Sequence, residues 1–216
     1  MAERGRPRSF DRTDALRRAM MLFWKHGYEG TSMADLTAAM GITAPSLYAA
    51  FGCKEALFRE VVEHYQANEG RFTGEALAAD TSAREAIEAM LNGAAVNLGA
   101  TGGCLVVTAA TKCGADNETV GSYLQENRVS RNDAIHRRLE RALEEGELPP
   151  GTDTRGLATF YATLLQGMSI QARDGTSKKS LKAAVSAAMS AWPMPPTLPT
   201  SATTARKRSP KASAGS

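Results

Sequence analysis

The sequence predicts an all-α protein in which an N-terminal three-helix domain with a helix-turn-helix is joined to a larger C-terminal helical domain. Alanine, leucine, methionine and glutamate recur throughout the 216 residues while aromatic residues make up only 6%, a composition that favours helices over strands. Hydrophobic residues reach 43%, which supports a folded core. Glycine, proline and aspartate interrupt the apolar pattern at helix-length intervals, so the chain reads as a series of separate helices.

The first helix is expected to begin after Asp11, whose carboxylate suits an N-cap, with Asp14 near the positive end of the helix dipole. Gly27 is expected to end this helix in the left-handed conformation. Its apolar residues fall on one face and should be buried: Leu16, Ala19, Met20, Phe23 and Trp24.

The next twenty-odd residues have the spacing of a helix-turn-helix. Thr31 or Ser32 caps a short helix that ends near Met40, and Gly41 permits the sharp turn. Thr43 then caps a third helix that ends at a glycine. The residues expected to pack the two helices together are Leu36, Met40, Ile42, Leu47 and either Ala50 or Phe51.

The outward residues of this third helix are small or hydrogen-bonding and carry no charge. They are Ala44, Pro45, Ser46, Tyr48 and Ala49. A helix of this kind can approach base edges in a DNA major groove without repulsion from acidic side chains.

A fourth helix is expected over 54–68, where it connects the two domains, and a hinge over 70–81. The later helical stretches are expected at about 82–98, 103–113, 117–145, 153–173 and 177–191. The last segment, 193–216, is rich in proline, serine, threonine and basic residues and is expected to be disordered.

The formal net charge of +3 is small, but its distribution along the chain is uneven. The first 25 residues hold seven basic residues against three acidic ones, and residues 1–9 read as a basic disordered arm. Such a local excess suits a polyanionic partner, although a solvated, frayed terminus is the alternative interpretation.

No apolar run approaches the roughly 18 to 20 residues that span a bilayer, and no signal peptide is evident, so neither membrane association nor export is expected. Cys53, Cys104 and Cys113 are odd in number and lack metal-ligand spacing, which favours a reducing cytoplasm with no metal and no cofactor.

The N-terminal segment resembles one known family specifically. Arg-Pro-Arg-Ser-Phe-Asp is followed by Ala-Leu, Leu-Phe, His-Gly-Tyr, Gly-Thr-Ser-Met and Asp-Leu, and then by Gly-Ile-Thr, Ser-Leu-Tyr, Phe and Lys-Glu-Ala-Leu. From about Asp11 to Tyr65 this pattern is similar to the signature of the TetR/AcrR transcriptional regulators. The resemblance implies a homodimer that binds a palindromic operator in double-stranded DNA, usually as a repressor, and is released by a small-molecule effector.

The same resemblance divides the chain into a basic arm (1–9), a DNA-binding domain (10–53), an effector-binding and dimerisation domain (54–192) and a tail (193–216). The recognition helix would approach the bases with its outward residues, while other groups would meet phosphates or the minor groove. The implied DNA contacts are Arg4, Arg6, Arg8, Thr31, Ser32, Thr43, Ala44, Pro45, Ser46, Tyr48, Ala49 and Lys54.

For the C-terminal domain the resemblance implies two further features, a dimer seam and an effector pocket. The last two helices would pair with those of a second copy through Leu164, Leu165, Met168, Leu181, Ala184, Val185, Ala188 and Met189. The pocket is expected near Tyr65, Met90, Asn97, Cys104, Thr108, Tyr123, Tyr161 and Gln166, each of which is equally compatible with a place in the core.

Three alternatives remain open at this point. Cys53, beside Lys54 at a helix N-terminus, and Cys104 are candidate thiols of a redox- or electrophile-sensing regulator with the same fold. A protein that coats DNA without sequence preference would also use basic ends. An enzyme is disfavoured, because no nucleophile and base are paired and the three histidines are expected to lie apart on helix surfaces.

Overall fold

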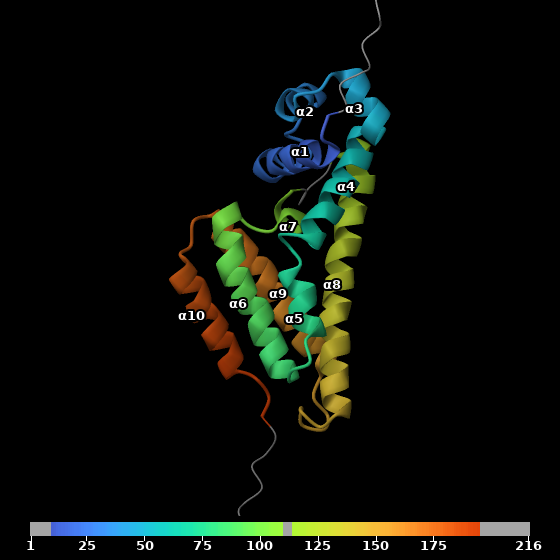
Figure 1. Ribbon diagram of the computed structural model, residues 1–216. Helices are drawn as coiled ribbons and strands as arrows, with labels where there is room; N and C mark the ends of the chain where they lie inside the picture. The colour runs from blue at the N-terminus through green and yellow to red at the C-terminus, as the bar shows by residue number, and fades with distance from the viewer. Residues whose placement is uncertain (1–9, 110–113, 195–216) are drawn as a thin grey trace, which may run out of the picture.

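The computed structural model is all-helical over the part of the chain that it describes, residues 10–109 and 114–194, with residues 99–101 described by their backbone only (Figure 1). This confirms the predicted fold class. The elements in chain order are α1 (Arg12–His26), α2 (Met33–Met40), α3 (Ala44–Phe51), α4 (Lys54–Ala67), α5 (Phe72–Ala78), α6 (Ala83–Thr101), α7 (Leu105–Thr108), the 3-10 turn η1 (Ala115–Asn117), α8 (Glu118–Glu144), α9 (Thr154–Arg173) and α10 (Lys178–Ser190).

Helices α1 to α3 form one end of the molecule, and α4 leads from them into the larger helical body (Figure 1). The predicted N-cap of α1 is confirmed, because the Asp11 carboxylate accepts hydrogen bonds from the amides of Thr13 and Asp14 at 2.9 and 3.1 Å. Gly27 does end α1 with a positive φ of 74°, but its ψ of 174° differs from the left-handed helical conformation that was predicted. The five predicted apolar residues of α1 are all buried.

The N-terminal core is closed by aromatic side chains from α1 and α4. Phe23 and Tyr28 each pack edge-on against Phe58, with ring centroids 5.0 Å apart in both pairs. Leu36, Leu47 and Phe51 complete the joint between α2 and α3, and Ala50 is only half-buried, so Phe51 is the inward residue of the predicted pair.

The larger body is built around α6, which contacts α5, α9 and α10, while α8 runs along one side and packs on α9 (Figure 1). The hinge predicted over 70–81 is wrong, because α5 occupies most of it. Gly70 and Gly74 suggested a break, but the Phe72 ring packs so closely on α6 that a Cβ at Gly93 would lie 2.7 Å from it. This long-range contact outweighs the weak local helix propensity of the glycines.

The helix predicted over 103–113 is also much shorter among the described residues, where α7 spans Leu105–Thr108. Gly102 and Gly103 have φ angles of 75° and 96°, and a Cβ at Gly103 would lie 2.6 Å from the Ser169 carbonyl oxygen. The backbone can therefore pass close to α9, where the Cys104 amide donates to Ser169 Oγ at 2.7 Å. Cys113 lies outside the described residues.

The apolar stripe predicted to form a dimer seam packs mainly within the monomer instead. Six of its eight members are at most 7% exposed: Leu165, Met168, Leu181, Val185, Ala188 and Met189. Leu164 and Ala184 are half-buried. The apolar face of α10 packs against α6 of the same chain. The sequence pattern cannot distinguish this partner from a helix of a second copy.

The prediction that the histidines lie on helix surfaces is wrong for His136. It is 9% exposed, and its Nε2 lies 3.3 Å from Thr154 Oγ1 where α8 meets the start of α9. Within the described residues, no helix is both long and apolar enough to cross a membrane.

Candidate DNA interface and effector cavity

The outer edge of α3 is uncharged and accessible. Thr43, Ala44, Pro45, Tyr48 and Ala49 are exposed and Ser46 is half-buried, so the structure brings these predicted residues together on one edge. Tyr48 is 52% exposed, so both its ring and its hydroxyl are accessible on this face. Hydroxyl groups, methyl groups and the rings of Pro45 and Tyr48 project from this edge, and such groups suit base edges and thymine methyls.

The first turn of α3 is fixed by its own hydroxyls. The Thr43 Oγ1 atom accepts from the Ser46 amide at 3.4 Å and lies 2.9 Å from Ser46 Oγ. Pro45 stands in the same turn, where the missing N–H leaves no hydrogen bond unmade. The two hydroxyls are therefore held in fixed positions at the end of the helix that faces solvent.

Arg12 anchors the far end of α3, a role that the sequence did not indicate. Its guanidinium lies 4.5 Å from the centroid of the Phe51 ring, donates to the Ala50 carbonyl at 3.4 Å and pairs with Glu60 at 2.7 Å. These partners lie 38 and 48 residues further along the chain, so no local pattern could have revealed them. Arg12 thereby ties α1, α3 and α4 together.

At the start of α2, Ser32 and not Thr31 is the cap. Ser32 Oγ accepts from the Asp35 amide at 3.1 Å, and the Asp35 carboxylate accepts from the Ser32 hydroxyl and amide at 2.6 and 3.0 Å. The Ser32 hydroxyl and then its amide lower the pKa of Asp35. Ser32 is exposed and remains available at the helix N-terminus.

Thr31 is not available to DNA, which corrects the prediction that it contacts a phosphate. Its side chain is 1% exposed in the fold, and its hydroxyl donates to the Gly27 carbonyl at 2.7 Å. The inward turn of this hydroxyl closes the loop between α1 and α2.

Lys54 lies at the start of α4 with its Nζ 4.3 Å from the centroid of the Tyr28 ring. Burial lowers the pKa of this ammonium, while the nearby Glu29 carboxylate acts in the opposite direction. The predicted contacts Arg4, Arg6 and Arg8 lie outside the described residues.

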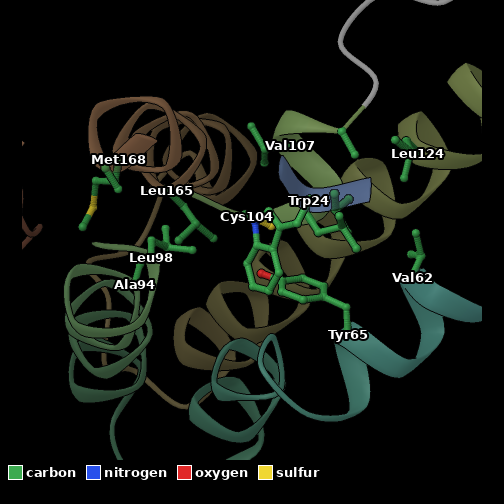
Figure 2. Packing of buried hydrophobic residues seen from close by; sticks show 14 of the residues in the cluster. Trp24, Val62, Tyr65, Ala94, Leu98, Cys104, Val107, Leu124, Leu165 and Met168 are labelled. Carbon is green, nitrogen blue, oxygen red and sulfur yellow. The ribbon is translucent and has the colours of Figure 1, made fainter. Parts of the chain in front are cut away.

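The N-terminal domain is joined to the larger body by buried hydrogen bonds from α1. The Trp24 indole donates to the Gly103 carbonyl at 2.8 Å. Its ring packs edge-on against Tyr65, with centroids 5.0 Å apart, and Figure 2 shows the two side chains next to each other. Beside it, the Tyr28 amide donates to the Ala109 carbonyl at 2.8 Å. These two hydrogen bonds attach the end of α1 and the residues after it to the backbone on either side of α7.

A second connection runs from the α1–α2 loop to the start of α8. Glu29 Oε1 accepts from the Gly114 amide at 2.6 Å and from Asn117 Nδ2 at 3.1 Å. These two hydrogen bonds, the amide of Gly114 first, lower the pKa of Glu29. The longest helix of the described chain thus begins against the end formed by α1 to α3.

A cavity of about 420 Å³ lies directly behind the Trp24 and Tyr65 contact. Its walls come from the end of α4, from α5, α7 and α8, and from Leu98 and Leu165. Most of the lining is apolar, with a few polar groups that include Tyr65, Cys104 and Arg131. This combination is typical of small-molecule sites.

Of the eight residues predicted for the effector pocket, only Tyr65 and Cys104 line this cavity. Thr108 lines a larger, open cleft of about 1060 Å³ between α1 and the body. The other five predicted residues do not line this cavity: Met90, Asn97, Tyr123, Tyr161 and Gln166. Met90 and Tyr161 are core residues, and Asn97 is exposed on α6 with its amide donating to the Gly93 carbonyl.

Comparison with protein-family models finds two matches that together span most of the chain. Residues 15–61 match the model described as bacterial regulatory proteins of the tetR family. Residues 81–189 match the model described as the C-terminal domain of tetracyclin repressor-like proteins.

Individual relatives agree with these models. The transcriptional repressor ComR of Escherichia coli strain K12 is 35% identical over 195 residues, which are 88% of this chain and 92% of ComR. The repressor BdcR of the same strain is 29% identical over 82% of this chain and 86% of BdcR. These relatives are transcriptional regulators and not enzymes.

Among solved structures, a cysteine variant of the TetR family regulator CifR superposes with a TM-score of 0.83. It is 44% identical in sequence and covers 88% of this chain and 100% of its own. That structure is a complex with 26-bp double-strand operator DNA.

Proposed function

This chain belongs to the TetR family of transcriptional regulators, and from that premise we propose that it is a homodimeric repressor that binds a palindromic operator and is released by a small molecule. Residues 10–53 serve as the DNA-binding domain and 54–192 as the effector-binding and dimerisation domain in this proposal. The proposed DNA contacts are Ser32, Thr43, Ala44, Pro45, Ser46, Tyr48, Ala49 and Lys54, together with Arg4, Arg6 and Arg8 from the N-terminal arm.

The observation that carries the proposal is the uncharged, exposed edge of α3, anchored by Arg12. Phosphate contacts position a protein on DNA, whereas base contacts specify the sequence, and a helix-turn-helix makes its base contacts through a helix that enters the major groove. The operator complex of the 44% identical CifR supports the same mode of binding for this chain.

A second copy would dock on the outward faces of α9 and α10. Phe160 is 46% exposed on α9, and Thr163 and Gly167 follow it on the same face. On α10 the exposed residues include Ala183 and Ala187, which allow two helices to approach closely. These residues replace the buried stripe of the sequence prediction as the proposed interface.

Release would begin at the cavity behind Trp24. A ligand there contacts α4 through Tyr65 and the segment that leads into α7 through Cys104. Tyr65 packs against Trp24 of α1, and Gly103, next to Cys104, accepts from the Trp24 indole. A ligand that binds better to a conformation with displaced α1 shifts the population toward it, and the two recognition helices no longer match successive major grooves.

Selection of bound DNA from a random pool tests the DNA-binding part. We expect a two-fold symmetric site to emerge, and we expect Lys54→Ala to weaken binding to it with a shallower dependence on salt. Tyr48→Phe removes one phosphate hydrogen bond and should weaken binding less than Tyr48→Ala. A pool that shows no enrichment would overturn the proposal in favour of binding without sequence preference.

A thiol sensor of the same fold is the second candidate, and the position of Cys104 favours it. This thiol lines the cavity, lies 3.8 Å from Arg131 Nη1 and follows the glycine that accepts from Trp24. Peroxide would convert it to a sulfenic acid, with one S–O bond formed, the O–O bond broken and water released. Cys53 is exposed, but its sulfur caps α4 by accepting from the Ala56 amide at 3.4 Å.

Substitution of the thiols separates the two candidates. The thiol-sensor hypothesis predicts that peroxide dissociates the wild type from the operator, while Cys104→Ser remains bound. Cys53→Ser is the matched control and should respond as the wild type does. If the variant with both Cys53→Ser and Cys104→Ser and the wild type respond alike to peroxide, a sensor based on these thiols is excluded.

A further inference from the structure

Arg131 of α8 is a cation that lines the effector cavity with almost no partner. Its Nη2 atom is buried and makes no hydrogen bond, and its Nη1 atom has only the Cys104 sulfur, at 3.8 Å. No ion pair involves it within the described part of the chain. By contrast, Arg59 pairs with Glu55 at 2.8 Å. Arg138 also has buried nitrogens without a hydrogen bond, but it donates to the Thr81 carbonyl, faces Glu147 and does not line the cavity.

The groups around Arg131 suit an anion. Among the described residues that line the cavity there is no aspartate or glutamate, and both charged residues are arginines, Arg71 and Arg131. Arg71 is turned to solvent and pairs with Glu75 at 3.4 Å, so it does not compete for a ligand inside. The cavity therefore has a positive, incompletely hydrogen-bonded end.

Tyr65 supplies a second donor beside it. The phenol is 3% exposed, and burial, with Cys104 adding to the effect, holds its pKa far above its ordinary value. The phenol is therefore neutral and keeps its proton for donation. Glu69 acts on the same phenol but does not line the cavity.

Apolar side chains form one part of the other walls, namely Phe72, Leu77, Leu98, Val106, Val107 and Leu165, and Gln66, Thr73, Asn127 and Ser130 add polar groups. A ligand that fills the cavity must therefore carry an apolar body as well as a head group for the arginine. A guanidinium and a carboxylate match in geometry and form paired, charge-assisted hydrogen bonds. A buried guanidinium nitrogen without a partner gains most from such a ligand, because its desolvation has no other compensation.

We propose that the effector is a small organic carboxylate whose head group binds Arg131 and the Tyr65 hydroxyl and whose apolar body lies against α5 and α7. This inference rests on the proposed function, since it names the chemical class of the ligand for the same cavity. The carboxylate joins α8 to α4 next to Trp24, which is the contact through which release would begin.

Matched acids and amides test the proposal on the full-length protein. Benzoate and hexanoate are compared with benzamide and hexanamide in calorimetric and thermal-shift titrations. The proteins are wild type, Arg131→Gln, Arg131→Lys and, as a control, Arg137→Gln, which removes an exposed arginine from the same helix. Operator binding in the same series reports whether each variant is folded.

Wild type and Arg137→Gln should bind the carboxylates in preference to the amides. Arg131→Gln should bind the carboxylates about tenfold to a hundredfold more weakly, the range set by a charge-assisted hydrogen bond, and Arg131→Lys should fall between. Equal binding of acids and amides by wild type, no binding of either acid at millimolar concentration, or an unchanged affinity in Arg131→Gln would overturn the inference.

The operator measurements distinguish a wrong ligand class from a wrong proposed function. If carboxylates bind through Arg131 but leave operator affinity unchanged, the ligand class holds and ligand-induced release is wrong. If the amides release the operator as well as the acids do, release holds and the ligand class is wrong.

Discussion

The two halves of this molecule differ in how completely their buried polar groups are satisfied. In α1 to α3 the helix caps are all paired, by Asp11, Ser32 and Thr43, and Arg12 has three partners. Among the described residues, every buried side-chain polar atom without a hydrogen bond lies between residues 69 and 161. These atoms belong to Glu69, Arg131, Asn132, Arg138 and Tyr161.

This difference matches the division of labour that we propose. A helix that reads base edges must keep one position, so its supports are complete and rigid. A domain that responds to a ligand needs groups that the ligand can bind. The ligand then shifts an equilibrium only through contacts that differ between two states. Of these five residues only Arg131 lines the cavity, so in our proposal the ligand supplies the partner that this side chain lacks.

The largest expected effect comes from matched core truncations in the two halves. Leu47 and Leu91 are both fully buried, and replacement of either by alanine should lower the free energy of unfolding by about 2–5 kcal/mol. Only Leu47→Ala should also weaken operator binding at temperatures where both variants are folded, because Leu47 seats the recognition helix. Chemical unfolding and operator titrations measure the two effects. Equal losses of operator affinity in Leu47→Ala and Leu91→Ala would contradict the proposal that only the N-terminal half reads DNA.

Trp24→Phe should break the connection between the halves. It leaves the Gly103 carbonyl without the indole donor, which should cost about 1–3 kcal/mol of stability. Operator binding without ligand should persist. Release by ligand should weaken, because the hydrogen bond that joins α1 to the segment before α7 is lost. Ligand-dependent release measured by fluorescence anisotropy checks this, and undiminished release in the folded variant would place the connection elsewhere.

Two serine caps offer a smaller, paired comparison. Ser32 caps α2 and Ser177 caps α10, so alanine at either position should cost about 0.5–2 kcal/mol in thermal or chemical unfolding. Ser32→Ala should in addition reduce operator affinity, whereas Ser177→Ala should leave it unchanged. A loss of operator affinity in Ser177→Ala would mean that α10 influences the DNA-binding end.

The smallest effect concerns the Glu29 contact and its dependence on pH. Its pKa is lowered from 4.5 by hydrogen bonds that the folded state supplies, so this contribution to stability is complete above that value. It is lost as the pH falls through the lower folded pKa. Unfolding curves of Glu29→Gln and wild type should therefore converge in acid, below pH 4.5, and separate above it. A constant difference at every pH would contradict the assigned cause.

The sequence predicted the N-terminal half well because its contacts are local. The N-caps, the glycines that end the helices and the buried faces of α1 to α3 lie within one or two helical turns of the residues they serve, and the structure confirms them. Thr31 was misassigned because both Thr31 and Ser32 suit a cap, and only the inward turn of one hydroxyl distinguishes them.

The sensing half resisted prediction because its partners are distant in the chain. The α5 helix exists through contact with Gly93, and the buried stripe of α10 packs on α6. The cavity combines α4, α5, α7 and α8, so no spacing in the sequence could select Arg131 as a lining residue. The one signal was a basic residue on a long helix, which is usually a solvated one.

The most direct test of the account compares three DNA duplexes at one salt concentration: the selected palindrome, the same DNA with one half scrambled, and fully scrambled DNA. We predict that the palindrome binds at least about a thousandfold more tightly than fully scrambled DNA, and that scrambling one half removes most of this advantage. Equal affinity for all three duplexes would contradict the claim that two copies of α3 read a symmetric operator.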